Sequence, residues 1–301
     1  MMKQPQPFFS IIIPTYGRPD QLALCLQALR RLDYPRTHFE VVVVNDGWNH
    51  PLEPVTTPFR DDLNLTVLQQ PNAGPAAARN FGAAHAKGEF FAFTDDDCMP
   101  ATNWLLTLAE RFRRAPEHLI GGRTLIALSD NMYSKTSQAI IEVVYAYYNS
   151  DPARASFFAS NNLAAPADRF RTLGGFDPTF RTSEDRDFCD RWLHRGYLMT
   201  YAPDVTVHHA HPLRFGSFWN QHFAYGRGAW RYHTARAQRG SGQFRPELKF
   251  YMSLLRYPFV CGRNVQAARM FLTLLLAQTA NAAGFFRQWI TQVWPSRVAA
   301  E

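Results

Sequence analysis

The sequence predicts an α/β protein, with an open, mostly parallel twisted sheet flanked by helices and followed by a helical C-terminal region. Short apolar, β-branched runs alternate with helical patterns over the first third of the chain, as in parallel sheets. Polar residues gather directly after three of these runs, where open α/β sheets place their ligands. The 301 residues are 46% hydrophobic, which allows a large core and excludes intrinsic disorder.

Strands and helices are expected to alternate in the first third of the chain. The valine run that ends at Val44 is typical of a parallel strand covered on both faces. After Pro19, apolar side chains recur every three or four residues, which indicates a helix with one buried face. The expected strands are residues 9–13, 40–44, 66–68 and 90–94, and the expected helices begin at Pro19, span 75–87 and run from 102 to about 114.

The second half is less regular. A helix is expected from Glu184 to about Arg195, with Ser183 as its N-cap, and a short strand at 205–207. Helical patterns follow beyond residue 212. The longest uncharged stretch there, residues 270–286, is 17 residues long and contains Thr, Gln and Asn. Because a membrane span needs about 20 mostly apolar residues, we expect a buried or interfacial helix instead.

Charge divides the chain into two unequal parts. Residues 1–201 hold 20 Lys and Arg against 22 Asp and Glu, whereas residues 202–301 hold 12 against 3. A basic region of this kind suggests a polyanionic partner, such as nucleic acid, an anionic membrane face or phosphate groups. A solvated basic surface is the alternative.

The cysteines indicate a reducing compartment. Cys25, Cys98, Cys189 and Cys261 are far apart and form no CxxC motif, so a zinc knuckle or a dithiol site is not indicated. The apolar run before Pro14 is too short for the core of a signal peptide.

Three consecutive aspartates follow the strand at 90–94. In an extended segment Asp95 and Asp97 point to one side and Asp96 to the other. Two carboxylates on one side suit Mg²⁺ or Mn²⁺ held together with substrate phosphates. A solvated acidic turn is the alternative.

Asp46 and Arg79 are two further candidates for ligand binding. Asp46 ends the valine strand, where a carboxylate can accept from a base or a ribose hydroxyl, or can form an Asx-turn with Gly47. Arg79 lies within an expected helix and suits a diphosphate or the acidic triplet, unless it is a surface residue.

Candidate acid–base and metal-binding groups come later in the chain. Glu184 and Asp185 open a helix, where a carboxylate near a cleft can act as a general base or can simply complement the helix dipole. His209 and His211 share one side of an extended segment and could join a carboxylate-bound metal, or could be surface histidines. Walker A, GxGxxG, GxSxG and HExxH motifs are absent, which disfavours P-loop, dinucleotide and elbow-serine chemistry.

The order of these motifs resembles the family 2 glycosyltransferases of the GT-A fold over roughly residues 8–230. The series runs Pro14-Thr15-Tyr16, Val44-Asn45-Asp46-Gly47, Asn72-Ala73-Gly74, Ala78-Arg79-Asn80, Thr94-Asp95-Asp96-Asp97, Ser160-Asn161-Asn162, Gly174-Gly175-Phe176-Asp177 and Glu184-Asp185-Arg186-Asp187. Tyr225-Gly226-Arg227-Gly228 looks like the close of that domain. Asn45 and Trp48 depart from the family, which usually has Asp and Ser there, and this bears on ribose and base recognition.

The resemblance implies an inverting, metal-dependent glycosyltransferase that moves a sugar from a nucleoside-diphosphate sugar to an acceptor hydroxyl. Asp185, with Glu184 beside it, would be the catalytic base, the choice between them being open. Asp97 and His209 would hold Mg²⁺ or Mn²⁺. The nucleotide sugar would be bound by Pro14, Thr15, Tyr16, Asp46, Arg79, Asp95, Asp96, Asn161 and Asn162, the two asparagines lying near the sugar or the acceptor.

The resemblance also implies partners and a division of the chain. It favours a UDP-sugar donor and a glycan or lipid-linked acceptor in cell-envelope polysaccharide, glycolipid or related glycan synthesis. Nucleic acid is not expected. The expected parts are a nucleotide-sugar-binding half (1–100), an acceptor-binding and catalytic half (101–212) and a basic helical region (213–301). We expect a cytoplasmic protein with peripheral contact to an anionic membrane at its inner face. The alternatives are a sugar-phosphate nucleotidyltransferase and a non-enzymatic carbohydrate- or nucleic-acid-binding module.

Overall fold

The computed structural model describes residues 6–128, 130–262 and 264–293, and it contains one eight-stranded sheet in the order β3-β2-β1-β4-β7-β6-β8-β5. The strands are β1 (Phe9–Thr15), β2 (Phe39–Asp46), β3 (Leu65–Gln70), β4 (Phe90–Thr94), β5 (Cys98–Pro100), β6 (Leu119–Ile126), β7 (Asn162–Pro166) and β8 (Met199–His209). The sheet runs without a break from the first third of the chain into the second.

The sheet is mostly parallel, as predicted. Strands β1 to β4 pair in parallel, and β6 pairs in parallel with β8. Strand β7 is antiparallel to both neighbours, and the short β5 is antiparallel to β8. The carboxyl ends of β1, β2 and β4 therefore lie at one edge, and the end of β8 reaches the same place through its pairing with β5.

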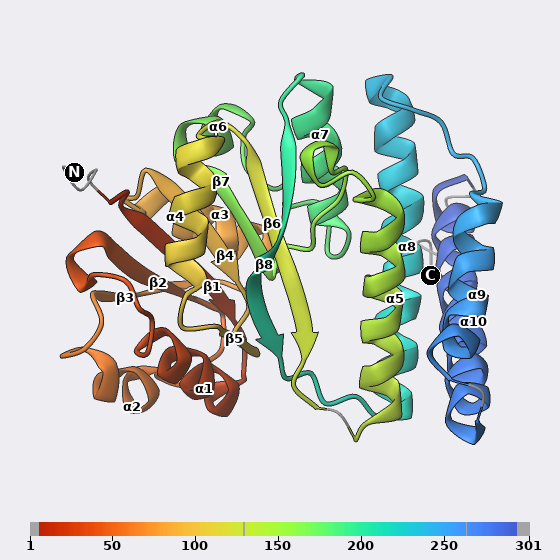
Figure 1. The fold of residues 1–301 in the computed structure, drawn as a ribbon, viewed down its shortest axis with the longest axis horizontal. Coiled ribbons are helices and arrows are strands. Elements are labelled where there is room, and N and C mark those ends of the chain that lie inside the picture. The colour runs from red at the N-terminus through yellow and green to blue at the C-terminus, as the bar shows by residue number, and fades with distance from the viewer. Residues whose placement is uncertain (1–5, 129, 263, 294–301) are drawn as a thin grey trace, which may run out of the picture.

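Helices cover both faces of the sheet (Figure 1). One core contains Leu26 of α1 (Pro19–Leu29) and Leu108 of α4 (Trp104–Arg114). The other contains Ala78 of α3 (Pro75–His85), Phe170 of α6 (Ala167–Thr172) and Phe188 of α7 (Glu184–His194). The remaining short elements are α2 (Glu53–Thr56), η1 (Arg36–His38), η2 (Thr57–Phe59) and η3 (Pro152–Arg154).

A group of long helices stands beside the sheet (Figure 1). Helices α5 (Met132–Tyr148) and α8 (Phe215–Arg239) lie nearer the sheet, and α9 (Leu248–Cys261) and α10 (Val265–Val293) lie on their outer side. Helices α8 and α10 approach closely at glycines, because a Cβ on Gly226 would stand 1.9 Å from the Asn281 carbonyl oxygen. No helix in the described part of the chain is both long and apolar enough to cross a membrane.

Most predicted elements of the first third are present, and their bounds differ by a few residues. The predicted helix at 75–87 is Pro75–His85, and the strand predicted at 205–207 is the eleven-residue β8. Strands β5, β6 and β7 and helix α5 were not predicted. Cys25, Cys98 and Cys189 are buried free thiols, as expected, and the side chain of Cys261 and residues 294–301 lie outside what the structure describes.

Candidate active site

Asp97 is the centre of a polar cluster formed where β4 leads into β5. Since Cys98 pairs with His209 across β5 and β8, the strand register brings His209 Nε2 to 3.2 Å from Asp97 Oδ1. His211 Nδ1 lies 3.2 Å from Asp97 Oδ2, and Arg18 donates to the same oxygen at 2.8 Å. Although burial opposes ionisation, hydrogen bonds from the two histidines and the charge of Arg18 hold the pKa of Asp97 well below its usual range. The acidic triplet is therefore not a solvated turn.

Asp96 does not line the site cavity, whereas Asp95 and Asp97 do, as predicted. The three residues form a turn between β4 and β5 and not the extended segment that the prediction assumed. Asp96 accepts a 2.7 Å hydrogen bond from Thr15 Oγ1 and pairs with Arg18 at 2.8 Å. Its side chain is fully buried, and burial raises its pKa to about 7. Asp96 thus ties the end of β4 to the end of β1.

The residues around Asp97 fit a divalent cation. Asp97, Cys98 and His209 offer ligand atoms that lie within 4.8 Å of one another. The carboxylate suits Mg²⁺ or Mn²⁺, imidazole suits transition-metal ions, and a thiol suits softer metals. Burial raises the pKa of the Cys98 thiol, and a protonated thiol is a poor ligand, so Asp97 with His209 and the adjacent His211 are the residues that could hold the cation.

Asp46 organises the loop that precedes α3. Its carboxylate accepts from the backbone N–H groups of Ala73 and Gly74, each at 2.9 Å, and from Gln70 Nε2 at 2.7 Å. The carboxylate therefore holds residues 73–74 in place and does not form an Asx-turn with Gly47. Gly47 has φ of +86°, and a Cβ there would stand 2.5 Å from the Asn72 nitrogen.

Arg79 bridges the two acidic motifs from a buried position. Helix α3 packs flat on β1 and β2, because a Cβ on Gly82 would stand only 2.7 Å from the Ile12 side chain. The guanidinium of Arg79 donates to Asp95 at 2.6 Å and to Glu184 at 2.9 Å. Burial alone would lower the pKa of Arg79, but the charges of these two carboxylates raise it. Arg79 therefore stays charged and balances the negative charge of the two carboxylates.

Helix α7 begins at a strained residue beside the site. Ser183 is at the N-cap, as predicted, but its φ of +68° is left-handed and its side chain makes no capping bond. A Cβ on Gly228 of α8 would stand 2.5 Å from Ser183 Oγ, so glycine lets α8 approach this turn. Burial, with a smaller contribution from the charge of the neighbouring Glu184, raises the pKa of Asp185 to about 7.

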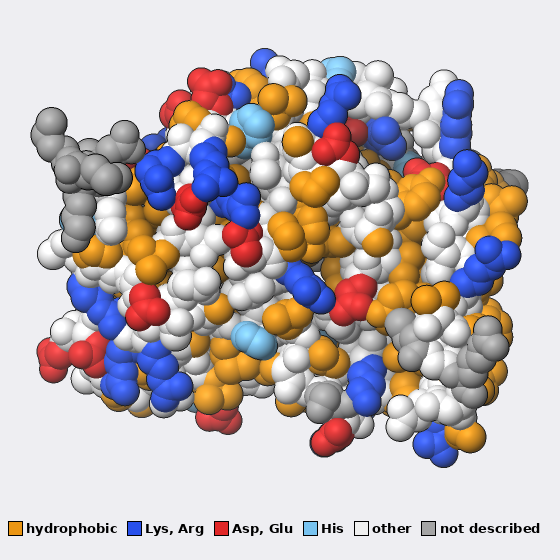
Figure 2. Space-filling view, in the orientation of Figure 1, with side chains coloured by type: hydrophobic (Ala, Val, Ile, Leu, Met, Phe, Trp, Pro, Cys, Tyr) orange, Lys and Arg blue, Asp and Glu red, His pale blue; other side chains and the backbone are white. Residues whose placement is uncertain are grey.

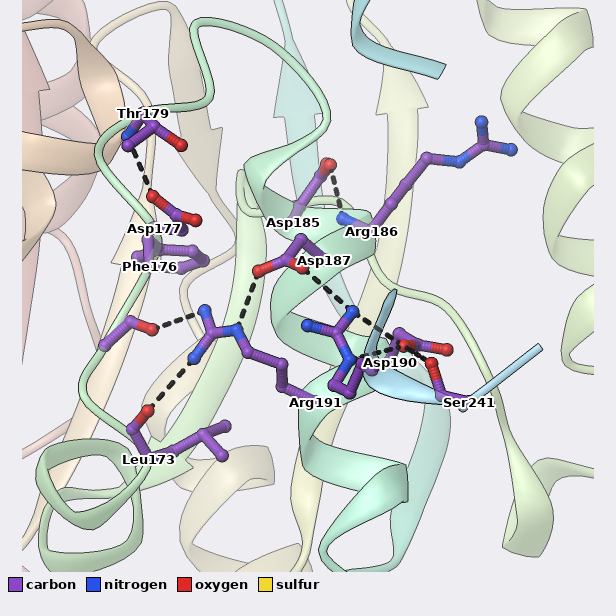
Figure 3. Close-up of polar contacts among 12 residues, drawn as sticks. Leu173, Phe176, Asp177, Thr179, Asp185, Arg186, Asp187, Asp190, Arg191 and Ser241 are labelled. Atoms are coloured by element: carbon purple, nitrogen blue, oxygen red, sulfur yellow. Dashed lines mark hydrogen bonds and ion pairs between the residues drawn. The ribbon is translucent and has the colours of Figure 1, made fainter. Parts of the chain in front are cut away.

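A network of ion pairs fixes α7 behind Asp185. Arg191 donates to Asp187 at 2.7 Å and to the carbonyl oxygens of Leu173 and Gly175. Arg239, at the end of α8, pairs with Asp187 at 3.0 Å. Figure 3 shows Asp185 and Arg186 extending away from this network. The helix start is thus fixed by ion pairs, while these two side chains line the cavity.

The two asparagines take different places. Asn161 accepts from Thr124 Oγ1 at 3.3 Å and lines the site cavity. Asn162 is buried, accepts from Trp104 Nε1 and donates to the carbonyl oxygens of Arg123 and Val205, at the register shift between β6 and β8. It therefore stabilises the sheet.

One cavity of about 1220 Å³ brings the predicted site residues together. Asp96 and Asn162 are the two predicted residues that do not line it. Sequence analysis did not single out Arg18, although it follows the first strand; it considered His211 beside His209 as a metal ligand, but the family resemblance implied only His209. The predicted residues that line the cavity are Pro14, Thr15, Tyr16, Asp46, Arg79, Asp95, Asp97, Asn161, Glu184, Asp185 and His209.

Comparison with known proteins decides the family. A family model described as glycosyl transferase family 2 matches residues 10–171, more than half of the chain. The chain belongs to glycosyl transferase family 2. The enzyme is therefore a glycosyltransferase, and the nucleotidyltransferase and binding-module alternatives are set aside.

The matches with curated relatives cover different shares of the relatives' lengths. Glycosyltransferase AglE of Haloferax volcanii is 26% identical over 226 residues, which cover 74% of this chain and 73% of AglE. The pre-mycofactocin glycosyltransferase of Mycobacterium tuberculosis is 29% identical over 216 residues, which cover 67% of this chain and 42% of the relative. The chain thus matches less than half of that second protein.

Solved structures show the GT-A fold. The mannosyltransferase PcManGT from Pyrobaculum calidifontis, in complex with GDP-Man and Mn²⁺, matches with a TM-score of 0.67 at 20% identity, covering 98% of this chain and 89% of that one. Residues 1–349 of S. aureus TarS, in complex with UDP-GlcNAc, match with a TM-score of 0.62 at 15% identity, covering 95% and 91%.

Proposed function

We propose that the enzyme transfers a sugar from a nucleoside-diphosphate sugar to an acceptor hydroxyl, with inversion and with Asp185 as the general base. One observation carries the proposal: Asp185 lines the same cavity as Asp95 and Asp97 and has a pKa raised to about 7. A base with a pKa near the working pH is both ionised and basic enough to take a proton.

Glu184 is the weaker candidate for the base. It is buried, and its carboxylate is engaged by a 2.9 Å hydrogen bond from Arg79. Asp185 accepts only from the backbone N–H of Arg186, at 2.8 Å, among the hydrogen bonds of the described residues. We therefore assign proton removal to Asp185 and the fixing of the helix start to Glu184.

The reaction is then a single displacement. Asp185 takes the proton from the acceptor hydroxyl, whose oxygen forms a bond to the anomeric carbon as the bond to the diphosphate oxygen breaks. Nucleoside diphosphate leaves, and the configuration is inverted. The side chains lining the donor side are Thr15, Tyr16, Asp46 and Asp95 at the ends of β1, β2 and β4.

Asp97, His209 and His211 would hold the divalent cation, Mg²⁺ or Mn²⁺. The bound cation would stabilise negative charge on the departing diphosphate. Arg18 pairs with Asp97 at 2.8 Å and helps to keep it in position, and the buried Asp96 pairs with Arg18 at 2.8 Å and keeps that side chain in position. PcManGT with Mn²⁺ supports this assignment by analogy of fold.

The acceptor side faces the basic helical region. Charge and apolar exposure favour an acceptor in a glycan or lipid-linked form and peripheral contact with an anionic membrane. Figure 2 shows apolar and basic side chains intermixed over α9 and α10 at the right edge. Exposed apolar residues on these helices include Val260, Leu272 and Ile290, and such a mixture suits an interfacial position.

Product analysis tests the proposal. Purified enzyme is incubated with UDP-, GDP- and dTDP-sugars and Mn²⁺, and released nucleotide is separated by chromatography. We expect one donor to release nucleoside diphosphate and to raise the melting temperature of the enzyme. Release of pyrophosphate, or no stabilisation by any nucleoside diphosphate, would contradict the proposal.

A further inference from the structure

The cavity continues past Asp185 into a space walled by α5, α9 and α10. We call this space the apolar chamber and define it by Tyr148, Phe250, Tyr251, Leu254, Leu275 and Phe286, all of which line the cavity. The chamber is continuous with the site that holds Asp95 and Asp97, and no sequence motif pointed to it.

Apolar side chains in the chamber remain open to water. Tyr251, Leu275 and Phe286 are 43%, 40% and 55% exposed although they line a cavity between packed helices. Water against such surfaces is unfavourable, and a ligand that covers them gains free energy. The occupant therefore has an apolar body.

A cation next to Asp185 in the sequence, Arg186, also lines the cavity. The guanidinium of Arg186 lies 5.8 Å from the ring centre of Phe157 and 5.6 Å from that of Tyr232, and it forms no ion pair with any carboxylate of the described residues. Figure 3 shows it extending away from Asp187 and Arg191, which pair with each other.

The other charges that line this part of the cavity have partners or lie at its edge. Asp190 pairs with Arg236 and Arg239, and Glu247 accepts from Tyr148 Oη at 3.1 Å. Arg245 adds a second exposed positive charge. Arg186 is thus the cation nearest in sequence to the base, and it remains available for an anionic ligand group.

We propose that the acceptor is an anionic amphiphile: its hydroxyl reaches Asp185, its anionic group pairs with Arg186, and its apolar chain occupies the apolar chamber. The inference rests on the proposed function, because it concerns the acceptor of that reaction. A guanidinium between two aromatic rings binds phosphate or carboxylate with both charge and paired hydrogen bonds.

Calorimetric titration of wild-type enzyme with three probes tests this inference: decyl phosphate and decyl maltoside, each below its micelle concentration, and inorganic phosphate. We expect decyl phosphate to bind more tightly than decyl maltoside, and inorganic phosphate not to compete. Equal binding of inorganic phosphate and decyl phosphate would overturn the proposal, because it would reveal a simple anion site.

Two leucines of α10 give a matched pair. Leu275→Gln changes the chamber, and we expect about tenfold weaker binding of both amphiphiles. Leu272→Gln changes the outer face, where Leu272 is 64% exposed and does not line the cavity, and we expect less than a twofold effect. Equal losses in the two variants, or no amphiphile binding to wild type, would overturn the proposal.

Arg186 gives the charge test. Arg186→Gln should weaken decyl phosphate binding about tenfold, remove its advantage over decyl maltoside, and leave the melting-temperature shift from nucleoside diphosphate with Mn²⁺ unchanged. Arg186→Lys should restore part of the advantage. Unchanged preference in Arg186→Gln would overturn the anionic assignment. Because nucleotide binding is measured separately, failure of the proposed function would be visible on its own.

Discussion

The two sides of the cavity are built differently. On the donor side, polar groups are fixed by several partners each: Asp46 by three donors, Asp97 by two histidines and Arg18, and Arg79 by two carboxylates. On the acceptor side, apolar side chains of the apolar chamber remain exposed to solvent between helices. The family match, residues 10–171, contains most of the donor side and ends before α7 to α10. The matched region thus identifies the family, and most of the acceptor site that we propose lies outside it.

Apart from the loss of the catalytic base, the largest effect on activity is expected at the metal cluster. Asp97→Asn removes the negative charge that His209, His211 and Arg18 surround, and activity should fall about 10²- to 10³-fold. The dependence of rate on Mn²⁺ concentration checks the cause. Asp204→Asn, at an exposed ion pair with Arg111, is the control and should keep full activity. If Asp97→Asn and wild type depended equally on Mn²⁺ concentration, Asp97 would not be a metal ligand.

The bridge between the two sides should matter for stability. Arg79→Gln leaves Asp95 and Glu184 without their shared cation in a buried place, and we expect a loss of about 3–5 kcal/mol in unfolding free energy. Arg111→Gln breaks an exposed pair and should cost less than about 1 kcal/mol. Urea denaturation measures both. Similar costs would mean that the bridge does not hold the two sides together.

Activity should depend on pH through Asp185. Its pKa of about 7 means that kcat/KM falls about tenfold for each unit below pH 7 and levels off above it. Because burial raises this pKa from 3.8, ionising Asp185 destabilises the fold as pH rises from about 4 to about 7. Asp185→Asn should therefore melt no lower than wild type at pH 8. A flat rate profile between pH 5 and 7 would remove Asp185 as the base.

The smallest effect is expected where α8 packs against α10, away from the donor side. Gly226→Ala would place a Cβ 1.9 Å from the Asn281 carbonyl oxygen, so we expect a loss of about 1–3 kcal/mol. Gly216→Ala lies in the same helix with nothing within 4 Å and should be neutral or slightly stabilising. Denaturation monitored by tryptophan fluorescence checks both. A greater cost for Gly216→Ala would contradict the described packing of α8 against α10.

Local sequence patterns predicted the parts of the fold that depend on local chemistry. Continuous apolar runs indicate buried parallel strands, so β1, β2 and β4 were predicted together with the polar groups at their ends. Strand β6 was not predicted, because its Gly121 and Gly122 are required by contacts from far along the chain: a Cβ at either would strike Phe158 or Asn162. Such packing has no local pattern.

Individual site residues show the same limit. Asp95 and Asp97 share the cavity as predicted, but they do so from a turn between β4 and β5 and not from an extended strand, and the contact of Asp96 with Thr15 was not predicted. The bridge from Arg79 to Glu184 joins residues 105 positions apart. The apolar chamber forms only where α5, α9 and α10 come together, and each of its apolar residues alone resembles ordinary core.

The central claim is that Asp185 removes the acceptor proton. The most direct measurement is the rate of nucleoside diphosphate release by Asp185→Asn compared with Asp168→Asn, an exposed acid in the first turn of α6. The account predicts a loss of about 10²- to 10⁴-fold in Asp185→Asn with unchanged donor affinity, and full activity in Asp168→Asn. Full activity of Asp185→Asn would contradict the account.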